Sequence, residues 1–353
     1  MKRILISVFL FFISTMVLAG LPTKNLVFFG DSLTDDGNCY AVFKIVPKSP
    51  PYYKGRFSNG ITWAEHLNKY SYDKSLTGYI NFSVGGAETI RHSFKTDKFI
   101  SPMLLEIEVH KYLKSEDAKN LDNTLFFVWN GPNDYLHERE PNKDKVTTDV
   151  INKMTESFVK LLDAGAMHIV ILNLPDLSRI PYARKNDIVD ELALSVKLHN
   201  KKLKDTVDTL QNKHPNKITF IDIETIFNDL LDNPKKYNDK YGSNITDVTS
   251  PCWEGSIVGT EKKPPIDQII AEIDAINKFN NNFDLDANLL SQAIIGSPVL
   301  SESYNLSKQF DEGLTPCDNP SEHIFWDKTH PSAAVHEVLG KILIDLLAEK
   351  NLV

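Results

Sequence analysis

The chain has 353 residues, of which 42% are hydrophobic and 24% are charged. This is the composition of a globular protein with a full core, and it excludes a disordered chain. The net charge is −8 and no basic run occurs, which argues against nucleic acid as a partner and against electrostatic binding to an anionic membrane.

The N-terminus has the pattern of a secretory signal peptide. Two basic residues, Lys2 and Arg3, precede an uncharged apolar run that ends at Ala19. The run is shorter than the roughly 20 residues that span a bilayer, so a membrane anchor is the weaker interpretation. We expect residues 1–19 to be cleaved and the mature chain to be secreted, extracellular or periplasmic, without an integral membrane segment.

Apolar runs alternate with helical patterns along the rest of the chain. Runs rich in Val, Ile, Leu and Phe suit strands that are buried on both faces, and they occupy Asn25–Phe29, Tyr79–Val84, Thr124–Trp129, His168–Leu174 and Ile218–Ile223. Apolar residues recur at helical spacing in Met103–Leu113, Val150–Leu162, Leu192–Leu210 and Ala333–Leu347. The alternation predicts an α/β fold: a three-layer αβα sandwich around a central, mostly parallel five-stranded sheet.

One segment interrupts this alternation. Residues 253–316 have no strand pattern, but they contain two amphipathic stretches, 266–276 and 285–294. We expect an inserted helical pair within a single domain of residues 20–353, rather than a second domain.

Polar or glycine-rich turns follow the first three predicted strands. Ser32 comes after the first strand, Gly85-Gly86 after the second and Asn133 after the third. Ligands of open parallel sheets bind beyond the carboxyl ends of the strands, so these turns are expected to meet at one edge.

Ser32 is a candidate nucleophile, but a serine hydroxyl needs a base. His330 is the best of the ten histidines, because Asp327 precedes it by three residues in one tight turn. Asp327 is then able to accept the Nδ1–H of the imidazole and leave Nε2 free for the Ser32 proton. Acyl transfer also needs donors for the oxyanion, which Gly86, Asn133 and the N–H of Ser32 are able to supply.

Each of these features has an ordinary structural interpretation. Ser32 alone is a helix cap as readily as a nucleophile, the glycine pair alone is a turn, and Asp327 with His330 alone is a capping pair. Their combination, each at a strand exit or before the last helix, favours a serine esterase. No His-Glu-x-x-His or Cys-x-x-Cys motif occurs, so we expect neither a metal nor another cofactor.

Four blocks of the sequence resemble the SGNH, or GDSL, hydrolase family. They are Phe29–Asn38, Asn81–Ala87, Gly131–Asp134 and Phe325–Pro331, in the family's order. The resemblance implies a catalytic triad of Ser32, Asp327 and His330, with an oxyanion hole of Ser32, Gly86 and Asn133. No Gly-x-Ser-x-Gly occurs, which argues against the α/β-hydrolase fold.

Within the family, the chain is most similar to the secreted bacterial lipolytic branch. This resemblance implies a phospholipid or lysophospholipid substrate, acyl transfer to an alcohol such as cholesterol, and a disulfide between Cys252 and Cys317 that leaves Cys39 free. A carbohydrate O-acetyl esterase and a non-catalytic lipid- or glycan-binding module are the alternatives.

The insertion suggests two further hypotheses. It borders the acyl-binding cleft as a lid, or it is only extra surface cover. A protease is also a candidate partner, since Lys262-Lys263 beside Pro264-Pro265 is a site where cleavage of the 253–316 loop would raise activity.

Overall fold

The structure is a computed structural model, and it describes residues 25–353 except for 76–77, 91–103, 137–139, 256–262 and 280–284. The expected signal peptide and Lys262 lie outside the described residues. In the described part of the chain, no helix is both long enough and apolar enough to cross a membrane.

The centre of the molecule is a five-stranded sheet in the order β2-β1-β3-β4-β5, and all neighbouring strands are parallel. The strands are β1 (Asn25–Gly30), β2 (Gly78–Asn81), β3 (Thr124–Trp129), β4 (His168–Leu172) and β5 (Ile218–Ile221). The predicted α/β sandwich with a five-stranded sheet is confirmed.

Three strands end earlier than the apolar pattern predicts. The end of β5 has a clear cause in Asn173, which follows β4. Its side-chain oxygen accepts hydrogen bonds from the backbone N–H groups of Ile223 (2.6 Å) and Glu224 (3.1 Å). Ile223 therefore begins a helix rather than extending the strand.

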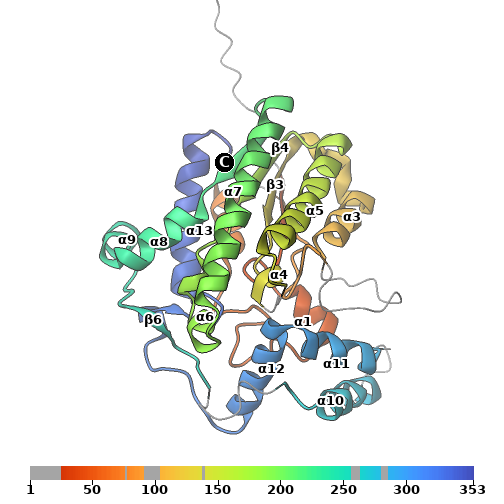
Figure 1. Ribbon diagram of the computed structural model, residues 1–353, viewed down its shortest axis with the longest axis vertical. Coiled ribbons are helices and arrows are strands. Elements are labelled where there is room, and N and C mark those ends of the chain that lie inside the picture. The colour runs from red at the N-terminus through yellow and green to blue at the C-terminus, as the bar shows by residue number, and fades with distance from the viewer. Residues whose placement is uncertain (1–24, 76–77, 91–103, 137–139, 256–262, 280–284) are drawn as a thin grey trace, which may run out of the picture.

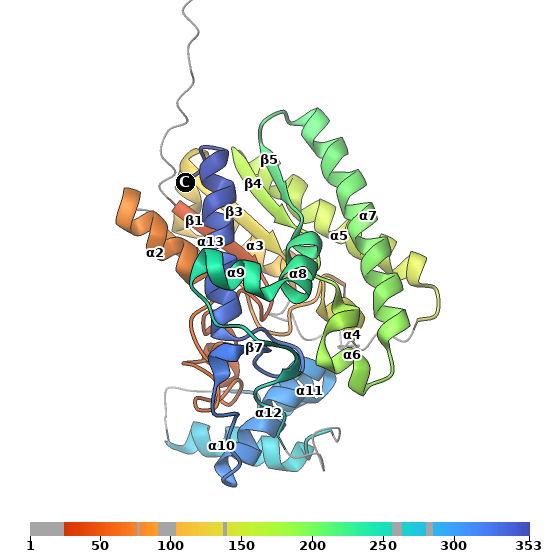
Figure 2. The same ribbon diagram turned by 90° about the vertical axis from the view of Figure 1, so that its left-hand side faces the viewer.

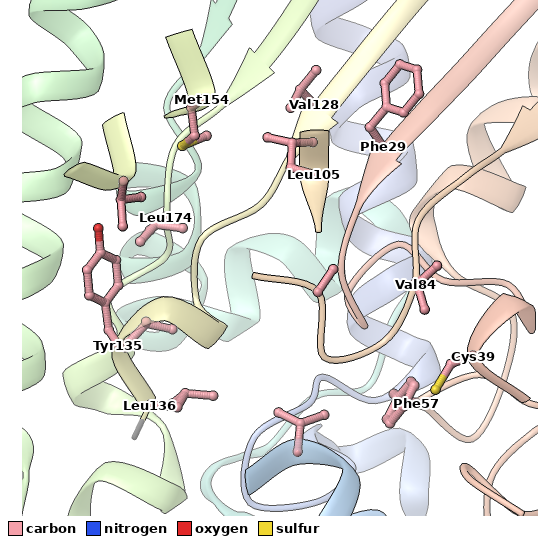
Figure 3. Packing of buried hydrophobic residues seen from close by; sticks show 14 of the residues in the cluster. Phe29, Cys39, Phe57, Val84, Leu105, Val128, Tyr135, Leu136, Met154 and Leu174 are labelled. Atoms are coloured by element: carbon pink, nitrogen blue, oxygen red, sulfur yellow. The ribbon is translucent and has the colours of Figure 1, made fainter. Parts of the chain in front are cut away.

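Helices cover both faces of the sheet (Figure 2). On one face, α2 (Trp63–Ser75) and α13 (Ala333–Glu349) pack on alternate strand residues such as Phe28 and Phe127. On the other face, α3 (Leu105–Lys114), α5 (Lys143–Ala164) and α7 (Val189–Lys213) pack on the residues between them, such as Phe29 and Val128 (Figure 3). The period of two along each strand divides the core into these two layers.

The remaining elements lie around this sandwich. Short helices are α1 (Asn38–Phe43), α4 (Asn133–Leu136), α6 (Pro181–Lys185), α8 (Ile223–Asp232) and α9 (Pro234–Tyr241). A second, two-stranded parallel sheet joins β6 (Asp247–Pro251) to β7 (His323–Phe325), which are the segments on either side of the insertion. The sequence pattern did not predict this sheet, because both strands are short and β6 is largely polar.

The described part of the insertion contains three helices: α10 (Ile266–Phe279), α11 (Ala287–Gly296) and α12 (Pro298–Asp311). They lie together at the lower end of the molecule in Figure 1. The expectation of a helical pair missed α12, which begins at Pro298 with Ser297 as its N-cap. Proline is well tolerated in a first helical turn, so this proline begins a helix rather than interrupting one.

Cys252 and Cys317 form a disulfide at the base of the insertion, and Cys39 is a buried free thiol. This is the pairing expected from the family resemblance. The disulfide closes the insertion next to β6 and β7.

Candidate active site

Turns from distant parts of the chain meet beyond the carboxyl ends of the strands. Ser32, Asn133 and His330 line one hollow, although they follow β1, follow β3 and precede α13 respectively. Gly86 lies in the turn after β2 with a φ of +79°, a conformation that glycine adopts without strain.

The three residues predicted to form the triad are connected by hydrogen bonds. The Oγ of Ser32 lies 2.9 Å from Nε2 of His330, and Nδ1 of His330 lies 2.8 and 2.9 Å from the two carboxylate oxygens of Asp327. All three side chains are buried. These distances suit proton transfer from the hydroxyl to the imidazole.

A tight turn sets the position of the imidazole. Asp327 Oδ1 accepts hydrogen bonds from the backbone N–H groups of Thr329 (2.8 Å) and His330 (2.7 Å). The backbone N–H of Trp326 in turn donates to the carbonyl of His330 at 2.8 Å. The three-residue spacing therefore places the carboxylate directly beside Nδ1.

The charges in this turn favour an ion pair. Burial by itself lowers the pKa of His330, but the Asp327 carboxylate raises it above its usual value through its charge and hydrogen bond. Burial raises the pKa of Asp327, and the charge of His330 together with its hydrogen bonds brings that pKa below its usual value. The Asp327 carboxylate is therefore placed where it would stabilise the imidazolium if His330 takes a proton.

Tyr52 is a site residue that the sequence analysis missed. Its hydroxyl donates to Oδ2 of Asp327 at 2.8 Å, and its ring packs edge-on against Phe57 and Trp326. Phe57 also lies against the imidazole of His330, with ring centres 5.0 Å apart. Tyr52 is 275 positions from Asp327 along the chain, and no motif connects them.

The expected oxyanion-hole donors are close together. The side-chain nitrogen of Asn133 donates to the carbonyl of Ala87 at 2.9 Å, which uses one of its two N–H bonds and connects it to the glycine turn. Within the described residues, the backbone N–H groups of Ser32 and Gly86 have no acceptor. Both groups are therefore free to donate to a substrate oxygen.

Two buried carboxylates join these turns to one another. Asp35 accepts the N–H of Gly85 at 2.7 Å and that of Gly37 at 2.8 Å, while Asp134 accepts the N–H groups of Thr89 and Ile90. Both acids lie within the motif blocks, but nothing in the sequence distinguishes them from ordinary turn residues. Their contacts connect the turn that holds Ser32, the turn that holds Gly85 and Gly86, and the turn that holds Asn133.

Gly85 is required for packing. A Cβ at this position would lie 2.0 Å from a ring carbon of Phe57, so a larger residue would displace the ring that contacts His330. The sequence by itself indicated only a turn at Gly85.

The hollow beside Ser32 is lined almost entirely by apolar side chains. Its cavity volume is about 60 Å³. Besides the site residues, its lining comes mainly from α8 and α13, with Val299 contributed by α12: Ile223, Ile226, Phe227 and Leu230, then Val335, Val338, Leu339 and Ile342. Such a lining suits a hydrocarbon chain whose ester end lies at Ser32.

Residues 26–343 match the family of GDSL-like lipases and acylhydrolases. The chain belongs to this GDSL family. It is therefore a member of a group of carboxylic-ester hydrolases, and the match includes all four motif blocks.

Several known proteins are similar to this GDSL chain. A phosphatidylcholine-sterol acyltransferase of Aeromonas hydrophila is 28% identical, over 90% of this chain and 88% of that protein. A thermolabile hemolysin of Vibrio parahaemolyticus is 24% identical, over 91% of this chain and 63% of that protein. An acetylesterase of Thermothelomyces thermophilus is 29% identical, over 62% of this chain and 76% of that protein.

Among solved structures, a carbohydrate acetylesterase of Sinorhizobium meliloti matches 57% of this chain and 85% of its own, at 14% identity and a TM-score of 0.38. A likeness at this level adds nothing to the fold described above.

Other histidines of this GDSL member have different surroundings. Burial lowers the pKa of both His199 and His336 to about 3. Nδ1 of His199 lies 2.8 Å from the hydroxyl of Tyr135, and Nδ1 of His336 accepts the backbone N–H of Trp63 at 3.3 Å. Within the described residues, no group of three or more His, Cys, Asp or Glu side chains is arranged to hold a metal ion.

Proposed function

We propose that this protein is a secreted serine esterase that releases fatty-acyl groups from phospholipids or lysophospholipids. Ser32 is the nucleophile, His330 the general base and Asp327 the residue that orients it. The observation that carries the proposal is that the Ser32–His330 pair, at 2.9 Å, opens onto a hollow lined mainly by apolar side chains.

The reaction proceeds in two halves. Nε2 of His330 takes the Ser32 proton while Oγ attacks the ester carbonyl, and the N–H groups of Ser32, Gly86 and Asn133 stabilise the oxyanion. His330 then gives the proton to the leaving alcohol, and the acyl group remains on Ser32. Water activated by His330 releases the fatty acid and restores the hydroxyl.

An alcohol in place of water would accept the acyl group. The hydroxyl of a sterol such as cholesterol is chemically suitable, because His330 deprotonates it in the same way as water. The similarity to a phosphatidylcholine-sterol acyltransferase over 90% of the chain supports this extension.

The lining of the hollow favours a long acyl group over an acetyl group. An acetyl group is too short to contact the side chains of α8 and α13. Each methylene of a longer acyl chain that is buried against them contributes about 0.8 kcal/mol to the binding free energy. A carbohydrate O-acetyl esterase is the second candidate, and the similarity to an acetylesterase is the observation in its favour.

A labelling and chain-length experiment separates these functions. We expect a fluorophosphonate probe to label the wild type and not Ser32→Ala, with hydrolysis of nitrophenyl esters rising from acetyl to octanoyl. Equal labelling of the two proteins would contradict the assignment of Ser32 and would leave a non-catalytic binding module as the function. Activity confined to acetate would favour the sugar esterase, and fatty-acid release from lysophospholipid and phospholipid vesicles, with and without cholesterol, tests the lipid substrate and the acceptor.

Export is supported by the N-terminal pattern and by the Cys252–Cys317 disulfide, which persists in oxidising compartments. Detection of the full-length precursor inside cells, without a shortened form outside the cytoplasm, would contradict it.

The lid hypothesis is supported by Val299 of α12, which lines the hollow. Lys263 is exposed, as the proposed cleavage by a protease requires. Limited proteolysis that leaves the 253–316 loop intact, or cuts it without changing the hydrolysis rate, would refute activation by cleavage.

A further inference from the structure

The insertion contacts the catalytic turn through a buried acid. Glu302 of α12 is only 7% exposed. Its Oε2 accepts a hydrogen bond from the hydroxyl of Thr329 at 3.2 Å, and its Oε1 lies 3.5 Å from Nζ of Lys328. Lys328 is also buried, with 6% of its side chain exposed. A charge in such a place is costly unless it has partners, so this arrangement depends on both contacts.

These two contacts are made to the only residues between Asp327 and His330. A displacement of Lys328 or Thr329 would move the imidazole relative to Ser32, because Asp327 and His330 are the ends of the same short turn. The insertion therefore restrains this turn through Glu302, which is not itself among the residues that line the hollow, although its partner Thr329 is.

We propose that Glu302 is a positioning residue for His330, which makes α12 a working part of the active site rather than surface cover. The inference rests on the catalytic role proposed for His330, and it extends that role to a residue outside the four motif blocks.

The position of Glu302 is itself restrained. Leu306, one turn further along α12, packs in a cluster with Tyr52, Trp253 and Trp326, and Trp326 adjoins Asp327. The Cys252–Cys317 disulfide borders the same cluster. Glu302 therefore approaches the turn from a firmly packed helix.

The charge of Glu302 also acts on His330. The charged and titratable groups that face Glu302 are Asp327, Lys328, His330 and the hydroxyl of Tyr52. Burial, with the Asp327 charge added to it, raises the pKa of Glu302 to about 7, while Lys328 and His330 oppose this rise. Burial lowers the pKa of His330, while the charges of Asp327, then Glu302 and Asp31, raise it. At pH values above about 7, where Glu302 is ionised, removal of its charge is therefore expected to lower the pKa of His330.

The test compares Glu302→Gln with Glu312→Gln, an exposed acid at the end of the same helix. The dependence of kcat and KM on pH is measured with a soluble nitrophenyl butyrate. In Glu302→Gln a neutral amide oxygen replaces the charged acceptor of the Thr329 hydroxyl, a difference of about 1 kcal/mol, so we expect kcat to fall about fivefold with KM little changed. The acid limb of kcat/KM is expected to move to lower pH, and Glu312→Gln should match the wild type.

A profile of Glu302→Gln that superimposes on that of the wild type would overturn the inference, as would an equal shift in Glu312→Gln. If thermal melting shows that Glu302→Gln does not fold, Thr329→Val is used in its place, since a methyl group there replaces the hydroxyl that donates to Glu302. An unchanged kcat in that variant would also overturn the inference. Ser32→Ala is measured alongside: full activity there refutes the proposed function, whereas an inactive Ser32→Ala with a normal Glu302→Gln refutes only the role of Glu302.

Discussion

The hollow beside Ser32 has a length that predicts which acyl chains it accepts. On α13 its lining runs from Val335, in the first turn after His330, to Ile342. These residues are seven positions apart, so at about 1.5 Å per residue the lined stretch is about 10 Å long. An extended chain of C–C bonds of about 1.5 Å advances about 1.3 Å per carbon, so the lined stretch is as long as a chain of about eight carbons.

Replacement of Ile342 by Phe would shorten this stretch at the end farther from His330. A phenyl ring reaches about two carbons further than the Ile side chain, and the loss of about 0.8 kcal/mol for each of two methylenes amounts to about 1.6 kcal/mol. We therefore expect kcat/KM for an octanoyl nitrophenyl ester to fall about 15-fold, with the acetyl ester nearly unchanged.

Leu343→Phe is the matched control. Leu343 is the next residue of α13 and is fully buried, but it packs against the sheet and does not line the hollow. Overpacking of either position costs about 1–3 kcal/mol of stability, so both variants should melt at lower temperature. Equal losses on the acetyl and octanoyl esters in Ile342→Phe, or a selective octanoyl loss in Leu343→Phe, would refute the assignment of the hollow to the acyl chain.

Three further predictions concern the triad and the disulfide. In Tyr52→Phe the ring packing remains but Asp327 loses a hydrogen bond, so kcat should fall about tenfold with KM unchanged; a wild-type kcat would exclude a role for this hydroxyl. His330 must be neutral to act, and Asp327 raises its pKa, so activity should be lost as pH falls through a value above the usual pKa of about 6.5. In a pH–rate profile of Asp327→Asn, this acid limb should move to lower pH. Reduction of Cys252–Cys317, which are 65 positions apart, should lower the free energy of unfolding by about 4 kcal/mol in denaturant titrations, and an unchanged midpoint would contradict this.

The sequence by itself determined the parts of the protein that depend on residue type and short spacing. Runs such as Thr124–Trp129 are apolar on both faces and short, as strands of a covered parallel sheet are, and their alternation with helical patterns made the sheet predictable. Asp327 and His330 are three residues apart, so their contact is a property of one turn. The sequence also predicted that the turns after the strands lie close together, because parallel strands bring their carboxyl ends to one edge of the sheet.

Only the tertiary structure decided which distant residues support that site. Tyr52 contacts Asp327 across 275 positions and Glu302 contacts Thr329 across 27, and neither belongs to a pattern that marks it as a site residue. The apolar residues of α8 and α13 have the same period whether they face a core or a hollow, so the sequence did not separate a lining residue such as Ile342 from a core residue such as Leu343. The spacing of apolar residues indicates which side of a helix is covered. Only the packing of the neighbouring elements determines whether space is left on that side for a ligand.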